Sequence, residues 1–360
     1  MLCLPSGGGS PNARRAVVKL DGKRPTRARL LDVARVAGVS KSTASRILND
    51  SPHISVRPHT RERVLASARQ LNYRPHAAAR GLSRAETGSV GLVIPSLAAP
   101  VYARIVRGAF RRALERDFVV LLLEDLAANQ TTDVFTRLVH GGRIDGVIVA
   151  SARPGHPLLR SLRRLAIPYV FANRAVRGSG RSVTMDDEKA SAAAIDHLVA
   201  LGHERIGHVG GPNGLDPARR RTAAFRAYGA RLGLQSLPIA QSEFTESGGA
   251  DAARRLLAEH PEVTALYISS LAQAVGVLHA AAELDRRVPN DLSVLAYDDM
   301  PLAEYLRPPL TTLRMPLAEL GAAAVDALLD QLSGGEPRNL VVAGEPKVVV
   351  RSSTASPPRK

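Results

Sequence analysis

The sequence predicts a small all-α helix-turn-helix headpiece with a hinge helix, joined to a two-lobed α/β domain with parallel sheets. Three observations carry this prediction: two short amphipathic segments around Gly38, an uneven distribution of positive charge, and alternating strands and helices from Val90 onward. At 360 residues the chain is long enough for a small domain followed by a larger one with two lobes.

Positive charge is concentrated towards the N-terminal end. Residues 1–84 contain 17 Lys and Arg against four Asp and Glu, a net charge of +13, whereas the rest of the chain contributes only +3. Such an asymmetry indicates a nucleic acid partner, because Lys and Arg side chains that neutralise phosphates release counterions and gain affinity. A basic tail that only aids solubility is the alternative explanation.

The terminal segments indicate the compartment. We expect disordered tails at residues 1–26 and 355–360, and the first of these lacks the apolar core of a secretion signal. No run of about 18 uncharged apolar residues predicts a membrane span. Cys3 is the only cysteine, which excludes an intramolecular disulfide and a cysteine-rich metal site. We therefore expect a cytoplasmic protein with no membrane partner.

Residues 27–75 are expected to form a helix-turn-helix domain. The first helix is expected to start at Thr26, and its apolar stripe at i, i+3, i+4 and i+7 consists of Leu30, Val33, Ala34 and Ala37. Gly38 ends this helix where a left-handed residue is needed, and Ser40 is a natural N-cap for the next one. The second helix of such a unit lies in the major groove of DNA.

A third helix and a hinge are expected to complete the headpiece. Arg57, Arg61 and Arg63 on the third helix are placed to touch backbone phosphates. Pro75 predicts a break, because the residue before proline avoids helix. The helical stretch 76–83 that follows is too short to be stable alone in water, so we expect a hinge helix and linker over 76–88.

From Val90 the pattern predicts two βα series. Strands are expected at 90–94, 118–123, 145–150, 168–171, 205–209, 265–268 and 293–297, and helices at 102–116, 190–201, 218–232, 249–259 and 272–284. The two lobes are expected to comprise 89–186 plus about 315–343, and 187–314 plus about 344–354. Ligands of such folds bind at the carboxyl ends of the strands, so we expect a ligand in the cleft between the lobes.

An ordered series of motifs makes the assignment specific. The motifs are Asp32-Val-Ala-Arg-Val-Ala-Gly-Val-Ser-Lys-Ser-Thr-Ala-Ser-Arg-Ile-Leu-Asn49, Thr60-Arg-Glu-Arg-Val64, Asn72-Tyr-Arg-Pro75 and Ala79-Arg-Gly-Leu82. Together they resemble the lactose-repressor/galactose-repressor (LacI/GalR) family of bacterial transcription regulators, and the likeness continues to about Ser353. The resemblance implies a periplasmic-binding-protein-like effector domain and a homodimeric repressor that binds a pseudo-palindromic operator in double-stranded DNA. A sugar-like or other small-molecule effector would control it, with no other cofactor, no metal and no catalytic residue.

The resemblance also assigns DNA contacts. Lys41, Ser42 and Arg46 match recognition-helix positions, and Lys or Arg contacts to guanine are the commonest specific ones. Leu82 matches the hinge leucine that family dimers wedge into the minor groove. An ordinary polar helix face is the alternative for the first three. The full expected set is Lys41, Ser42, Thr43, Ser45, Arg46, Asn49, Arg57, Arg80 and Leu82.

The effector residues are assigned in the same way. Arg221 falls on the family's effector-binding arginine, whose guanidinium can bind hydroxyls or a carboxylate. Asp298 falls on its ligand-binding aspartate, whereas we interpret Asp299 as structural. Phe244 matches an aromatic that stacks on ligand rings, although it could equally belong to the core. The full expected set is Tyr102, Asn173, Arg221, Phe244, Ser270 and Asp298.

The chain departs from the family pattern at three places. Arg29 stands where the family has a Thr or Ser cap, and Ala44 stands where it has Val. Leu271 replaces an aspartate beside Ser270, which indicates a ligand with fewer hydroxyls or a structural substitution. A leucine heptad that would extend a dimer to a tetramer is not apparent at the C-terminal end.

Other classes of protein fit less well. The glycines of Gly210-Gly-Pro-Asn-Gly214 follow a strand, but no Gly-Lys-Ser/Thr comes after them, so they do not form a phosphate-binding loop. No zinc-protease or hydrolase motif occurs, which argues against an enzyme. A two-lobed solute-binding protein and a sequence-indifferent DNA-binding protein remain as alternatives; the first would need a secretion signal and no basic headpiece.

Overall fold

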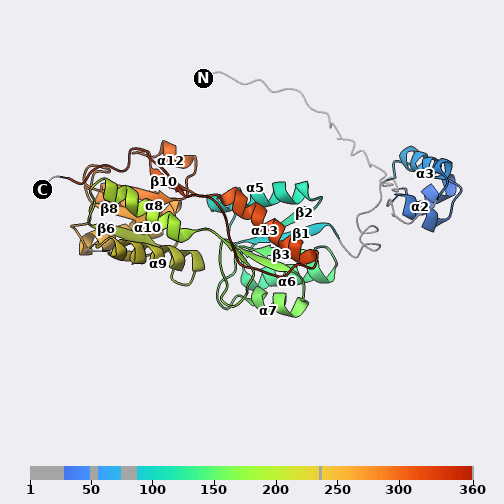
Figure 1. The fold of residues 1–360 in the computed structure, drawn as a ribbon, viewed down its shortest axis with the longest axis horizontal. Helices are drawn as coiled ribbons and strands as arrows, with labels where there is room; N and C mark the ends of the chain where they lie inside the picture. Colours follow the sequence, from blue (N-terminus) through green and yellow to red (C-terminus); the bar gives the residue numbers. More distant parts are fainter. Residues whose placement is uncertain (1–27, 49–55, 74–86, 235–236, 359–360) are drawn as a thin grey trace, which may run out of the picture. The chain divides into compact units, whose positions relative to one another are not determined.

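A computed structural model describes residues 28–48, 56–73, 87–234 and 237–358, shown in Figure 1. The chain divides into two compact units, residues 1–84 and residues 85–360. The expected N-terminal tail, most of the expected hinge segment, and the candidate residues Asn49, Arg80 and Leu82 lie outside the described residues.

The first unit contains three described helices: α1 (Leu30–Val36), α2 (Lys41–Leu48) and α3 (Pro58–Gln70). They pack around one small apolar core, whose buried members are Val33, Ala34, Ala37, Ala44, Ile47, Val64 and Ala68. The presence of Ala44 in this core shows that the smaller residue is accommodated there. The helix-turn-helix arrangement predicted from the apolar periodicity is therefore what the chain adopts.

The prediction that the first helix starts at Thr26 is wrong. Arg29 is extended, with φ −98° and ψ 157°, and α1 begins at the next residue, Leu30. The carboxylate of Asp32 accepts a hydrogen bond from the Arg29 backbone N–H at 2.8 Å. An acidic side chain three residues into the helix thus stabilises a start that lacks a Ser or Thr cap.

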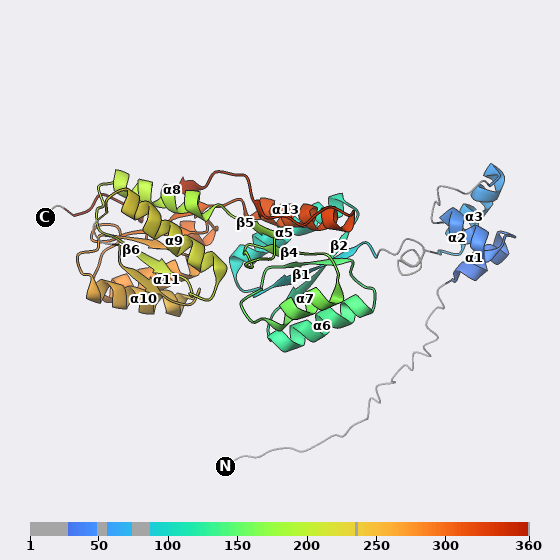
Figure 2. The same ribbon diagram turned by 60° about the horizontal axis from the view of Figure 1, so that its bottom comes forward.

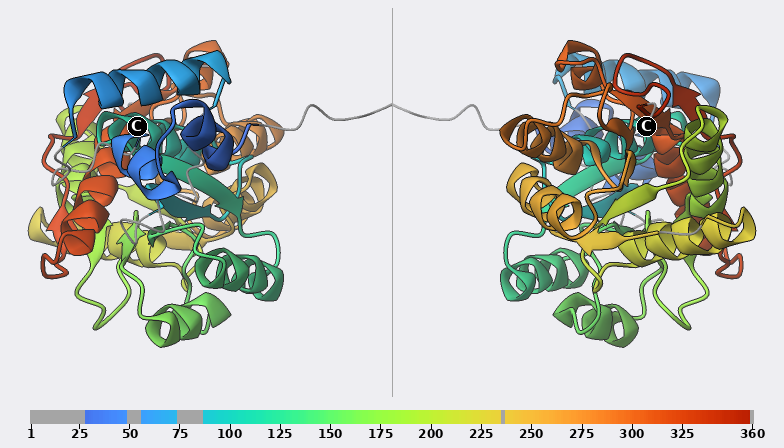
Figure 3. Two further views of the ribbon diagram at one scale, coloured as in Figure 1. Left: turned by 90° about the vertical axis from the view of Figure 1, so that its right-hand side faces the viewer. Right: turned by 90° about the vertical axis from the view of Figure 1, so that its left-hand side faces the viewer.

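The N-terminal lobe is a six-stranded parallel sheet in the order β11-β5-β4-β3-β1-β2. Its strands are β1 (Ser89–Ile94), β2 (Val119–Glu124), β3 (Gly146–Val149), β4 (Tyr169–Ala172), β5 (Ser182–Thr184) and β11 (Leu340–Val341). Its helices are α5 (Pro100–Glu115), α6 (Ala128–His140), α7 (Pro157–Leu165) and α13 (Leu317–Leu332). Figure 2 shows α5 and α13 on one face of the strands and α6 and α7 on the other, and the views in Figure 3 show α6 and α7 together on one side.

The C-terminal lobe has a second six-stranded sheet, in the order β12-β10-β9-β8-β6-β7. Its strands are β6 (Ile206–Gly210), β7 (Ile239–Gln241), β8 (Ala265–Ile268), β9 (Ser293–Tyr297), β10 (Thr311–Arg314) and β12 (Lys347–Val349), of which only β12 is antiparallel to its neighbour. Its helices are α8 (Asp187–Ala200), α9 (Asp216–Arg231), α10 (Glu246–Glu259), α11 (Leu271–Glu283) and α12 (Leu302–Tyr305). Helix α8 packs against α9, and α10 packs against α11.

The two lobes share the chain in an interleaved way. After β10 in the second sheet the chain returns to form α13 and β11 of the first lobe, and then goes back to form β12. Helices α5 and α13 approach closely at two glycines: a Cβ on Gly108 would lie 1.9 Å from the Ala318 carbonyl oxygen, and one on Gly321 would lie 2.0 Å from that of Ile105. The predicted two-lobed α/β fold with parallel sheets is confirmed.

One expectation at the C-terminal end needs correction. The sequence predicts Ala355 in a disordered tail, but its N–H donates to the Ser293 hydroxyl at 3.0 Å. Its carbonyl oxygen lies 2.8 Å from Nε2 of the buried His203. Ordered contacts with the C-terminal lobe therefore extend into this segment.

Candidate DNA-binding face and effector site

The turn between α1 and α2 is fixed by backbone and side-chain contacts. Gly38 has a φ of +59°, the left-handed conformation expected after the first helix. The hydroxyl of Ser40 accepts from the Thr43 N–H at 3.1 Å, which is the expected N-cap of α2. From α3, Nε of Arg63 donates to the Ala37 carbonyl oxygen at 2.8 Å. The sequence places Arg63 at DNA phosphates, but this nitrogen holds the end of α1 in place.

Helix α2 has one buried side and one exposed side. Ala44 and Ile47 face the core, whereas Lys41, Ser42 and Arg46 are exposed. An exposed face with two cations and a hydroxyl next to a rigid turn has the chemistry needed to bind base edges and phosphates. Contact of these three side chains with DNA stays a prediction.

Three further candidates differ in their exposure. Thr43 and Ser45 are half-buried, and the Thr43 hydroxyl lies 2.8 Å from that of Ser40. Arg57 is exposed at the residue before α3. The Thr43 hydroxyl is thus engaged in the local cap network, whereas Arg57 is accessible to a partner.

Arg221 lies in a buried polar cluster of the C-terminal lobe. It is 5% exposed on α9, its Nε donates to Asp187 Oδ1 at 3.1 Å, and its Nη1 donates to the Ser269 carbonyl oxygen at 2.6 Å. The Tyr297 hydroxyl donates to the same Asp187 oxygen at 2.8 Å, and its ring centroid lies 3.5 Å from the Arg221 guanidinium carbon. The guanidinium is therefore held rigidly by a carboxylate, a carbonyl and an aromatic face.

Asp298 follows β9 and belongs to the same cluster. It is 6% exposed and has a φ of +76°. Burial raises the pKa of its carboxyl group to about 6, while Arg221 acts in the opposite direction and Asp187 reinforces the rise. Among the described residues, no hydrogen-bond partner reaches the buried Oδ1 atom. Burying such an oxygen costs free energy unless a donor forms a hydrogen bond to it, so Asp298 is suited to accept a hydrogen bond from a ligand hydroxyl or amine.

Phe244 and Ser270 lie in the same lobe but have different surroundings. Phe244 is half-buried and packs over Gly211, where a Cβ would come within 2.2 Å of its ring. Ser270 is the N-cap of α11, and its hydroxyl accepts from the Gln273 N–H at 3.3 Å. The same hydroxyl donates to Gln273 Oε1 at 3.1 Å. Ser270 is thus committed to the helix start, and the buried Leu271 begins that helix.

The two candidates of the N-terminal lobe flank an arginine. Tyr102 on α5 is buried, and its hydroxyl accepts from Arg174 Nη2 at 3.1 Å. Asn173 follows β4 with a φ of +61°, a conformation that Asn tolerates better than most residues. Arg174 also donates to the Ala152 carbonyl oxygen, while its buried Nε has no partner among the described residues.

The interpretation of Asp299 as structural agrees with its contacts. Its carboxylate accepts from the Thr312 hydroxyl, from Nε of Arg314 and from Nη2 of Arg351, each at 2.8 Å. Although burial opposes it, hydrogen bonds from these groups hold the pKa of Asp299 below its ordinary value. Asp299 joins β10 to the C-terminal segment, in contrast to the neighbouring Asp298.

Sequence reasoning missed the residues that hold the candidates in place. The carboxylate of Asp187, which is 3% exposed, forms ion pairs with Arg220 and Arg221 and accepts a hydrogen bond from the Tyr297 hydroxyl. Arg174 forms the corresponding contact with Tyr102 in the other lobe. An acidic residue just before a predicted helix was a usable signal for Asp187, whereas nothing local marks Arg174.

Fold and site define a class of protein: a helix-turn-helix DNA-binding unit joined to a two-lobed ligand-binding domain. Residues 29–76 match the model of the bacterial regulatory proteins of the lacI family, and residues 195–354 match that of the periplasmic binding protein-like domain. The chain is 32% identical over 342 residues to the HTH-type transcriptional regulator MalR of Streptomyces coelicolor, covering 92% of this chain and 97% of that protein. The protein therefore belongs to the LacI family and is a DNA-binding transcriptional regulator.

Solved structures extend this likeness to complexes. A lac repressor dimer bound to operator and an anti-inducer is 28% identical, with a TM-score of 0.78, and the match covers 91% of this chain and 99% of that one. The regulator CelR in complex with cellobiose is 29% identical with a TM-score of 0.69, covering 91% of this chain and all of the other. Among the residues that the structure describes, no helix is long and apolar enough to cross a membrane.

Proposed function

We propose that this chain is a repressor that binds a pseudo-palindromic operator as a homodimer. A small metabolite bound between the lobes raises or lowers its affinity for that operator. The observation that carries the ligand part is Asp298, whose buried carboxylate oxygen lacks a donor within the described structure. A ligand hydroxyl or amine would donate a hydrogen bond to this oxygen, in the same buried cluster as the rigid guanidinium of Arg221. We expect the half-buried ring of Phe244, in the same lobe, to contact the ligand as well. This chemistry fits a sugar-like or other small metabolite that carries a hydroxyl or amine.

The DNA part rests on the exposed side of α2. In a dimer, each copy of Lys41, Ser42 and Arg46 would read one half-site, and the two-fold symmetry of the protein would set the half-site spacing. Relatives in the family include a dimeric repressor solved on its operator. Arg57, Arg80 and Asn49 would add backbone contacts, and the site of action would be the cytoplasm.

A contact between the lobes indicates how ligand binding could be transmitted. The Ala175 N–H, just after Asn173 and Arg174, donates to Asp216 Oδ2 at the start of α9, at 2.8 Å. Arg221 lies on the same helix. A ligand that contacts both lobes would change the relative stability of this contact in open and closed forms, and only such unequal binding can shift operator affinity.

The proposal is tested first by DNA specificity. Fluorescence anisotropy with the full chain should show that a DNA sequence enriched by this protein from a random pool is bound at least about 1,000 times tighter than random DNA at moderate salt. Equal affinity for both DNAs would favour the sequence-indifferent alternative and contradict the proposal. Arg46→Ala should lower the affinity for the specific DNA. The matched control is Arg205→Ala, in the C-terminal lobe, which should leave that affinity unchanged.

The ligand part is tested by thermal shift. Screening small metabolites against the full chain should give a hit that raises the melting temperature, because a ligand that binds the folded state stabilises it. Asp298→Asn and Arg221→Lys should each reduce that shift, while Asp251→Asn on the exposed surface should leave it unchanged. A hit that is insensitive to both site variants would place the ligand elsewhere.

The hinge is tested separately, since Leu82 lies outside the described residues. If Leu82 wedges a central minor-groove step, Leu82→Ala should weaken operator binding far more than binding to random DNA. An equal loss on both DNAs would show that the wedge assignment is wrong.

A further inference from the structure

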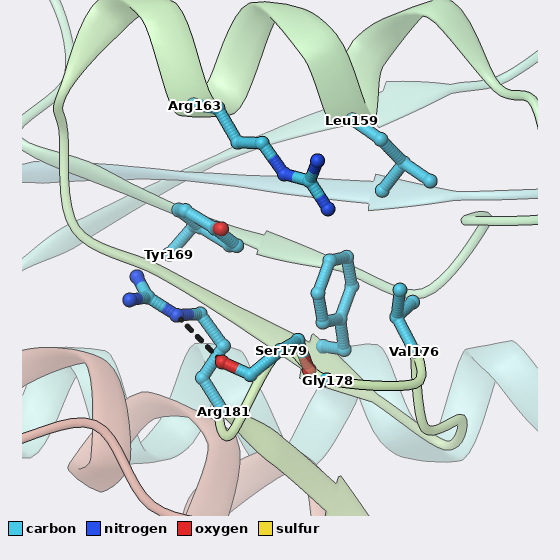
Figure 4. A pocket seen from close by; sticks show the side chains of 8 residues that line it. Leu159, Arg163, Tyr169, Val176, Gly178, Ser179 and Arg181 are labelled. Atoms are coloured by element: carbon cyan, nitrogen blue, oxygen red, sulfur yellow. Dashed lines mark hydrogen bonds between the residues drawn. The ribbon is translucent and has the colours of Figure 1, made fainter.

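A cavity of about 190 Å³ lies in the N-terminal lobe between α7 and the segment that joins β4 to β5. The apolar part of its lining consists of Leu159, Phe171 and Val176. Figure 4 shows the guanidinium groups of Arg163 and Arg181 on either side of Tyr169. None of the candidate effector residues lines it. It is therefore distinct from the site proposed above.

The local backbone explains why a cavity forms here. After β4 the chain turns back on itself, with the Ser179 N–H donating to the Val176 carbonyl oxygen at 3.0 Å. Gly178 and Gly180 have φ values of +73° and +65°, which L side chains rarely adopt. The turn holds Val176 beside the apolar cluster of α6 and α7. The space between this turn and α7 remains unfilled.

The segment that lines the cavity carries positive charge without any acidic residue. Residues 151–181 contain seven arginines and no Lys, Asp or Glu. Arg163 is exposed and Arg181 is half-buried, and within the described structure no carboxylate lies within 4.0 Å of either guanidinium. By contrast, Arg220 and Arg221 in the other lobe are both paired with Asp187.

Arg181 is held in a position from which it can bind a ligand. Its guanidinium carbon lies 4.1 Å from the Tyr169 ring centroid, and its Nε makes one long contact of 3.4 Å with the Ser179 carbonyl oxygen. The stacking fixes the plane of the group and leaves its two terminal nitrogens without a partner among the described residues. A guanidinium in this state favours bidentate binding of a carboxylate.

We propose that this cavity is a second ligand site, which takes a small organic carboxylate with an apolar ring-sized body. The size fits, because an apolar cavity of about 150 Å³ holds one benzene ring. The ring would lie against Leu159, Phe171 and Val176, and the carboxylate would lie between Arg163 and Arg181. An inorganic anion would leave the apolar wall unused, and a neutral ring would leave both cations unpaired.

Benzoate is the probe for this site, with the full-length protein carrying labelled Leu and Val methyl groups. NMR titration should show saturable shifts of the Leu159 and Val176 methyl signals. Benzamide, which has the same ring without the charge, and sulfate at matched ionic strength should each bind at least about tenfold more weakly than benzoate, a difference that corresponds to the loss of one charge-assisted contact.

Substitutions separate a built site from general attraction to a cationic surface. Arg163→Gln and Arg181→Gln should each weaken benzoate binding about tenfold, whereas Arg177→Gln, on the same turn but not lining the cavity, should change it less than twofold. The proposal is overturned if benzoate binds all three variants equally, if benzamide binds as well as benzoate, or if the methyl signals do not move. Binding here is independent of Asp298, so Asp298→Asn should leave it intact even if the proposed effector site fails.

Discussion

Replacing Asp298 by Asn should stabilise the protein at pH 8, although it removes a group that we place in the effector site. The carboxylate is buried, and burial is the largest cause of its raised pKa of about 6. An ionised group in such surroundings costs free energy in the folded state, and Asn keeps the shape while removing the charge. Stability given up for a ligand contact is a common feature of binding sites.

The magnitude follows from the raised pKa. The folded state binds the proton more tightly than the unfolded state, in which the pKa is about 3.8, so stability falls as pH rises from about 4 to 6 and stays lower above that. Because a pKa difference of one corresponds to about 1.36 kcal/mol, the rise from 3.8 to about 6 gives a gain for Asp298→Asn of about 3 kcal/mol at pH 8. At pH 4.5 the wild-type carboxyl is largely protonated when folded, and the gain should shrink to about 1 kcal/mol.

The assay is urea denaturation of the full chain followed by circular dichroism, at pH 8 and pH 4.5. The matched control is Asp299→Asn, which should destabilise the protein, because the carboxylate of Asp299 is bound by Thr312, Arg314 and Arg351 and has a lowered pKa. If Asp298→Asn proves destabilising at pH 8, or if its effect is the same at both pH values, the carboxylate is satisfied by contacts other than those described above.

Three more expectations concern single residues. Arg63→Gln should lower the free energy of unfolding of the headpiece by about 1 kcal/mol through loss of its bond to Ala37, as measured by thermal denaturation; an effect no larger than that of Arg69→Gln would contradict this. Burial lowers the pKa of His208 to about 4, so the folded state binds fewer protons than the unfolded state, and stability is lost as pH falls from about 6.5 to 4. His208→Gln should reduce this dependence of the free energy of unfolding on pH. If urea denaturation gives the same pH dependence for the variant and the wild type, the expectation is refuted. Arg46→Ala should cost about 1–3 kcal/mol at one base position of the operator, whereas a uniform loss across all sequences would show a phosphate contact.

Local patterns identified most of the elements but not their limits. Apolar periodicity and Gly38 marked the helix-turn-helix, and the strands at 265–268 and 293–297 agree with the prediction to the residue. The start of α1 was misplaced because Asp32 supplies the cap from inside the helix. Helices α6, α7 and α13 are absent from the elements predicted above, although Leu158, Leu162 and Leu165 of α7 have the i, i+4, i+7 spacing of an apolar helix stripe.

The candidate site shows a similar division. The resemblance to the family singles out Arg221 and Asp298, and the structure places both in one buried cluster. Their partners could not be predicted from the sequence, since Asp187 lies 34 residues from Arg221 in the chain and 110 residues from Tyr297. The resemblance assigns Ser270 to the effector site, but its hydroxyl caps the start of α11 through hydrogen bonds with Gln273.

Two copies of this chain, as proposed above, read a symmetric DNA site under the control of a small molecule. Selection of binding sequences by the full-length protein from a random DNA pool tests this most directly. We expect enriched sequences with two inverted half-sites, and an affinity for them that changes when a metabolite found by thermal shift is added. Recovery of no common motif, or an affinity that no stabilising metabolite alters, would contradict it.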